Sequence, residues 1–94
     1  MKAHARPDLT TPDLLELLSL DETGFKRRFA GTPMLRTKRR GLLRNACVAL
    51  GNIGTRTALP ILQAATRDLE PLVAEHAHWA IQQIEARAME PAPT

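Results

Sequence analysis

The feature that most constrains the fold is an apolar helical pattern that occurs twice, 31 residues apart. The first copy has apolar side chains at i, i+4, i+7 and i+11, namely Leu42, Ala46, Ala49 and Ile53. Leu43, Cys47 and Leu50 widen this stripe to the breadth of a core-facing helix. The second copy has the same spacing, namely Val73, Ala77, Ala80 and Ile84. Because a helical unit of this size cannot bury its apolar face alone, neighbouring units must share a core. The sequence therefore predicts an all-α protein, a HEAT-like α-solenoid fragment of about five to six helices in antiparallel pairs.

Capping residues divide the chain into predicted helices. Threonine or aspartate marks the helix starts, often followed by proline, and glycine marks several ends. The predicted helices cover residues 12–19, 22–30, 33–37, 38–53, 57–66 and 71–88. Gly41 indicates either the break between the third and fourth of these or a close approach by a neighbouring backbone, and we favour the break.

Two sets of side chains outside the repeated pattern are also expected to point inward. Phe25 and Phe29 share one face of their helix at i and i+4. The inner side of the helix after Thr57 is predicted to carry Leu59, Leu62, Ala65 and Leu69. Residues 11–88 are predicted to form a single domain between flexible tails at 1–10 and 89–94.

The charges are strongly segregated along the chain. No acidic residue occurs between Thr23 and Arg67, an interval that holds ten of the thirteen cations. Arg36, Arg40 and Arg44 are spaced to form one row on a continuous helix. Such a basic block favours binding of a polyanion, and the alternative is a solvated basic face without a partner.

No pattern in the sequence indicates an active site. The single Cys47 excludes an internal disulfide and an all-cysteine metal site within this chain. His76 and His78 point about 200° apart on a helix, so they cannot share an ion unaided. Trp79 is interpreted as a filler of the core or of the contact between repeats. The chain has no apolar run long enough for a membrane span and no apolar signal-peptide segment, so we expect a cytoplasmic domain.

The basic block suits phosphate recognition. Arginine guanidinium groups can bind phosphate oxygens in a bidentate manner. Aromatic side chains are few, so recognition of the backbone and shape of a structured nucleic acid is favoured over base stacking. Asn45, beside Arg44, is expected either to brace a neighbouring loop or to reach a ligand.

Several short motifs resemble the C-terminal region of epoxyqueuosine reductase. They are Gly31-Thr32-Pro33, Arg36, Arg39 or Arg40, the GLLRN of 41–45, the ALGN of 49–52, Pro71-Leu72-Val73, His76-Ala77 and Trp79-Ala80. The resemblance covers about residues 12–85, although Ala74-Glu75 and Glu85 depart from the family pattern. It implies an enzyme that reduces epoxyqueuosine to queuosine at the wobble position of tRNA, using cobalamin and two [4Fe-4S] clusters. Those cofactors would sit in a preceding catalytic region, and none is expected in this chain.

The resemblance and the charge pattern together predict a non-catalytic module that binds the tRNA anticodon stem-loop. The predicted RNA-facing residues are Arg36, Lys38, Arg39, Arg40, Arg44 and Asn45. Additional contacts are predicted for Lys26, Arg27, Arg28 and Thr32. The expected partners are tRNA and the catalytic region of the parent enzyme, with no membrane. The alternatives are a HEAT-like protein–protein scaffold whose basic face meets an acidic partner and, third, an enzyme of unrecognised type.

Overall fold

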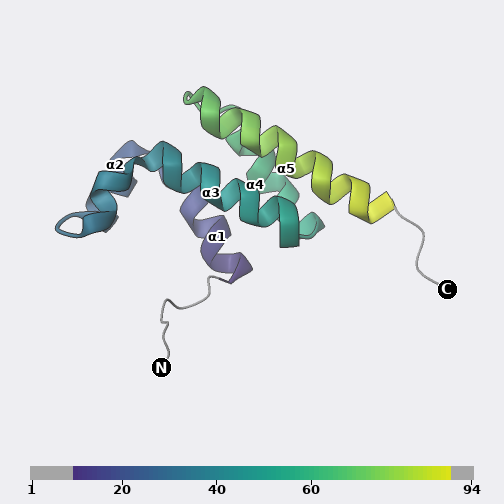
Figure 1. Cartoon of the computed structure of the whole chain (residues 1–94), viewed down its shortest axis with the longest axis horizontal. Coiled ribbons are helices and arrows are strands. Elements are labelled where there is room, and N and C mark those ends of the chain that lie inside the picture. Colours follow the sequence, from purple (N-terminus) through teal and green to yellow (C-terminus); the bar gives the residue numbers. More distant parts are fainter. Residues whose placement is uncertain (1–9, 90–94) are drawn as a thin grey trace.

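The computed structural model describes residues 10–89, and over that range the protein is all-α, as predicted (Figure 1). Five α-helices and two short 3-10 helices follow one another along the chain. They are α1 (Thr11–Leu18), α2 (Glu22–Phe29), η1 (Pro33–Thr37), α3 (Lys38–Ile53), η2 (Arg56–Ala58), α4 (Leu59–Ala65) and α5 (Pro71–Met89). The predicted tails fall almost entirely at 1–9 and 90–94, which lie outside the described residues. The break beside Gly41 is confirmed, because η1 ends and α3 begins three residues before it.

Local hydrogen bonds explain where the first two helices begin. The hydroxyl of Thr10 accepts the backbone N–H of Asp13 at 3.3 Å, and the Asp13 carboxylate accepts the N–H of Thr10 at 3.0 Å. This reciprocal pair is a capping box at the start of α1. The Asp21 carboxylate accepts the N–H of Gly24 at 2.7 Å and caps α2. Threonine and aspartate thus mark the starts of these two helices, as predicted.

Four helices form the packed body of the molecule. α3 and α5 lie side by side and run in the same direction, and they share the most extensive contact (Figure 1). α4 packs against α5, and α1 packs against α3 and α4. α2 lies at the end of this body and contacts mainly η1. The two copies of the repeated pattern thus correspond to neighbouring helices that share a core.

The buried face of α3 lies toward one edge of the predicted face. Leu43, Cys47 and Leu50 have no exposed surface, and Ala46 is 2% exposed. These four side chains belong to a core cluster that also includes Leu14, Leu18, Leu62, Val73, Ala77, Ala80 and Ile84. Ile53, the last residue of α3, is 59% exposed, so its predicted burial is wrong. Leu69 is 98% exposed, because α4 ends at Ala65 and the helical spacing does not continue to it.

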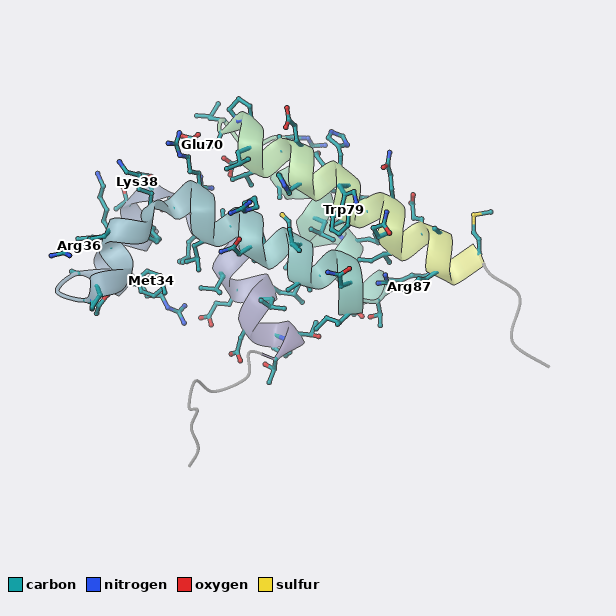
Figure 2. The ribbon with its side chains drawn as sticks, viewed as in Figure 1. Met34, Arg36, Lys38, Glu70, Trp79 and Arg87 are labelled. Carbon is teal, nitrogen blue, oxygen red and sulfur yellow. The ribbon has the colours of Figure 1, made fainter. Side chains whose placement is uncertain are left out.

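The end of α3 is held against α5 by a close contact and two hydrogen bonds. Gly51 is buried beneath the ring of the half-buried Trp79, and a Cβ at this position would overlap that ring. The guanidinium of Arg87, on α5, donates to the carbonyl oxygens of Gly51 and Gly54, the latter at 2.7 Å (Figure 2). These bonds satisfy two carbonyls at the end of α3 that have no partner within the helix. The interpretation of Trp79 as a filler between the two helices is confirmed.

The Gly51–Trp79 contact predicts that the effect of Gly51→Ala on stability depends on the residue at position 79. Gly51→Ala gains about 1 kcal/mol of helix propensity, but overpacking against Trp79 costs about 1–3 kcal/mol. We therefore expect a net loss of about 1–2 kcal/mol in the free energy of unfolding, measured by urea denaturation. In a Trp79→Leu background, the same substitution should be neutral or stabilising. Equal destabilisation in both backgrounds would contradict the packing argument.

Candidate nucleic-acid interface

A hollow of about 810 Å³ opens at the end of the molecule that carries α2 and η1. We call it the basic hollow; its lining residues are Glu22, Phe25, Lys26, Ala30, Leu35, Arg36, Lys38, Arg39, Arg40 and Glu70. Figure 2 shows Arg36 and Lys38 at this end and Glu70 directly before the start of α5. Five cations and two carboxylates thus surround one opening.

The basic hollow exists because the chain turns sharply before α3. Lys38 has φ of 65°, a left-handed backbone conformation that is unfavourable for a residue with a Cβ. This turn sets η1 at an angle to α3, so Arg36 does not continue the helical face of Arg40 and Arg44. The predicted single row of these three arginines is therefore wrong. Arg36 lies instead on η1 and lines the hollow with residues of α2 and α3.

Arg39 is engaged by the fold rather than exposed to solvent. Its Nε donates to the carbonyl oxygen of Leu20 at 2.7 Å, and its two terminal nitrogens donate to the two carboxylate oxygens of Asp68, one of them at 3.1 Å. The Asp68 carboxylate also accepts the backbone N–H of Glu70 at 3.0 Å. The side chains of Arg39 and Asp68 are only 13% and 11% exposed. We call this set of contacts the Arg39 clasp; it ties the α1–α2 connection and the α4–α5 loop to the start of α3.

The clasp perturbs the titration of Asp68. The hydrogen bonds from the Arg39 guanidinium, together with one from the backbone of Glu70, hold the pKa of the Asp68 carboxyl below its ordinary value. Asp68 is therefore ionised throughout the neutral range.

The other cations of the basic hollow are available to a ligand. Lys26, Arg36 and Lys38 are exposed and have no ion-pair partner among residues 10–89. Arg40 approaches Glu70 at 4.0 Å, and both side chains are about half exposed, at 57% and 44%. An ion pair this long and this exposed contributes little energy, so it does not remove Arg40 from ligand binding.

The remaining predicted contacts lie outside the lining of the basic hollow. Arg28 pairs with Glu16 at 3.3 Å and lies 5.9 Å from the ring centre of Phe29. The Thr32 hydroxyl donates to the carbonyl of Phe29 at 2.7 Å, at the end of α2. Arg44 is half-buried, and its Nε has no hydrogen-bond acceptor among residues 10–89. Arg27 and Asn45 are exposed.

The sequence prediction missed the acidic and apolar lining of the basic hollow. Glu22 precedes Lys26 by four residues on α2, a spacing that was visible in the sequence. Glu70 has no such local signal, because it reaches the hollow only through the packing of α5 beside α3. The carboxylates that frame this site were therefore only partly predictable.

A second, smaller hollow of about 370 Å³ is lined by Val48, Glu75, His76 and Trp79, between α3 and α5. The Nδ1 atom of His76 lies 2.8 Å from the carbonyl oxygen of Leu72, one turn earlier on α5. Within residues 10–89, no group of three or more histidine, cysteine or acidic residues is placed to hold a metal ion. Cys47 is fully buried in the core, and burial raises the pKa of its thiol to about 12. Cys47 therefore serves as a packing residue of the core, with its thiol protonated at neutral pH.

The chain is similar to epoxyqueuosine reductases over most of its length. It is 41% identical over 83 residues to the enzyme of Salmonella typhimurium and 40% identical over 81 residues to that of Xanthomonas campestris. The predicted resemblance is confirmed. These matches cover 87% and 85% of the chain, and the Lactococcus garvieae epoxyqueuosine reductase matches with 38% identity over 84% of it.

The chain spans less than a quarter of each of these epoxyqueuosine reductases, 22% or 23% of their length. No protein-family model and no solved structure matches it. The iron–sulfur clusters that the resemblance implies do not fit the described residues, because their one cysteine is buried and protonated at neutral pH. None of the helices in residues 10–89 combines the length and the apolar character needed to cross a bilayer.

Proposed function

We propose that this chain is a non-catalytic RNA-binding module of an epoxyqueuosine reductase and that the basic hollow binds the anticodon stem-loop of tRNA. The observation that carries the proposal is the convergence of Lys26, Arg36 and Lys38 on one opening without ion-pair partners in the described residues. The resemblance supplies the choice of tRNA and the role in queuosine biosynthesis.

The arrangement of the cations suits a bent phosphate backbone. Lys26 comes from α2, Arg36 from η1, and Lys38 and Arg40 from the start of α3, so the charges surround the opening rather than following one helix. A phosphate chain that crosses the opening can be contacted from both sides. Four such contacts would give a log–log salt slope of about −3, at about 0.7 per phosphate for a single strand.

The Arg39 clasp stabilises the backbone at the basic hollow. Because Arg39 is bound to Asp68 and Leu20, it holds the start of α3 in place and leaves phosphate contact to its neighbours. Arg44, Asn45, Arg27, Arg28 and Thr32 lie outside the basic hollow, and we propose them as contacts for the flanking stem.

The module does not supply redox chemistry in this proposal. In the parent enzyme, cobalamin and the clusters would supply the reductive step within a separate catalytic region, which is the second proposed partner. The residues described here bind and orient the RNA.

The proposal is tested by fluorescence anisotropy with the wild-type chain and a labelled anticodon stem-loop of a queuosine-type tRNA. We expect saturable binding at low salt that weakens with a slope of about −2 to −3 as salt increases. A blunt RNA duplex of equal length is the control and should bind more weakly at each salt concentration, because it cannot enter the hollow. If the stem-loop produces no change even at low salt, the proposal fails and the protein–protein scaffold becomes the better explanation.

A further inference from the structure

We infer that the basic hollow accepts an unpaired nucleotide and that Glu70, assisted by Glu22, recognises an amino-bearing base within it. This inference rests on the proposed RNA-binding function and extends it from the phosphate backbone to a single base. The nucleotide would place its phosphates on the cations of the rim and its base edge against the carboxylates.

The size of the basic hollow suits this occupant. Its volume of about 810 Å³ lies in the range of about 300–1,000 Å³ found for small-molecule sites. A double helix keeps its bases stacked inside, so only an unstacked nucleotide can insert a base into a concavity of this kind.

The two carboxylates in the lining are the observation that favours an amino-bearing base as the ligand. A surface that bound only phosphates would gain nothing from acidic groups in its lining, because each one repels the ligand. Glu22 and Glu70 nevertheless both line the hollow among its five cations. Carboxylate oxygens accept hydrogen bonds from base N–H groups, as in the pairing of Glu or Asp with the amine of cytosine. Their position therefore indicates a ligand that carries N–H donors as well as phosphates.

The Arg39 clasp positions the backbone of Glu70 for this role. Its backbone N–H donates to the Asp68 carboxylate at 3.0 Å, and Asp68 is itself bound by Arg39. Its side chain lies 4.0 Å from Arg40 and remains 44% exposed, so its oxygens keep capacity for further donors. Glu22 forms no ion pair among the described residues and lines the same hollow.

Apolar side chains supply a surface for the face of the base. Leu35 lines the basic hollow and is 40% exposed, and Ala30 lies exposed in the same lining. Phe25 contributes to the wall but is buried, so stacking on an aromatic face is not the main contact. Base recognition would therefore combine apolar contact with hydrogen bonds to the carboxylates.

The test compares short unstructured oligouridine RNAs that carry guanine, adenine, cytosine or uracil at one central position. For the wild-type chain, we expect at least one amino-bearing base to bind about fivefold more tightly than uracil. Glu70→Gln should remove most of this preference and should not raise affinity for the preferred RNA. Glu22→Gln should reduce the preference in part. Glu85→Gln, an equal change of charge at an exposed site of α5 outside the hollow, should preserve it.

If the interface bound RNA through electrostatic attraction alone, Glu70→Gln would have the opposite effect on affinity. Removing a carboxylate and freeing Arg40 would then raise the affinity for all four RNAs alike, and this outcome would overturn the inference while leaving the proposed RNA binding intact. Equal wild-type affinities for the four RNAs would overturn it as well. Absence of binding to all four oligouridine RNAs would likewise overturn the inference, whereas the proposed function is decided separately by the stem-loop titration.

Discussion

Arg39→Ala is expected to lower the free energy of unfolding by about 3 kcal/mol. The substitution would leave the Asp68 carboxylate, only 11% exposed, without its charged partner. It would also remove the donor to the carbonyl of Leu20. Urea denaturation followed by circular dichroism at neutral pH measures this loss.

A matched control is available one residue away. Arg40→Ala removes an equal charge from an exposed pair with Glu70 and should change stability by no more than about 0.5 kcal/mol. Arg39→Lys should not restore full stability, because an ammonium group cannot form the bidentate contact. Equal effects of Arg39→Ala and Arg40→Ala would show that the clasp does not stabilise the fold.

The clasp also predicts part of the pH dependence of stability. Because the pKa of Asp68 is lower in the folded chain than in the unfolded chain, the carboxylate stabilises the fold above its unfolded pKa of about 3.9. That contribution is lost as the pH falls through the lowered folded pKa. Asp68→Asn should therefore be less stable at neutral pH and should lose less additional stability in acid than the wild type.

The second large effect is expected for RNA binding by a chain that carries Arg36→Ala and Lys38→Gly. We expect a tenfold to thirtyfold loss of affinity for the stem-loop, roughly 1.4–2 kcal/mol, and a salt slope shallower by about 1.4. Stability should be unchanged or should increase by about 1 kcal/mol, because glycine relieves the left-handed backbone at Lys38. On the same sample, anisotropy should thus show a loss of affinity and urea denaturation should show no loss of stability.

A control variant distinguishes the effect of the substituted positions on RNA binding from the effect of the lower net charge. Arg56→Glu changes the net charge by the same two units at an exposed residue of η2, outside the lining of the basic hollow. It should weaken binding by less than about threefold, through long-range electrostatics alone. If Arg56→Glu weakens binding as much as the double substitution, the basic hollow is not the RNA site.

The helices were largely predictable because their signals are local. Thr10 and Asp21 cap the helices that their neighbours were expected to form, and the break before α3 was visible from Gly41. The burial of Ile53 and Leu69 was mispredicted, because helical spacing does not show how far a helix extends or how its face is rotated toward its neighbours. The HEAT-like arrangement and the boundaries of the domain remain predictions.

The sequence alone determined the helical class, the caps and the cationic block, because each depends on residues within a few positions of one another. The tertiary structure decided which cations remain available. Asp68 lies 29 residues from Arg39 along the chain, and only the packing of the α4–α5 loop against the start of α3 brings the two together. The same packing places Glu70 in the basic hollow, so an interval without acidic residues in the sequence becomes a mixed surface in space. Charge segregation is a property of the chain, whereas charge pairing depends on which segments pack together.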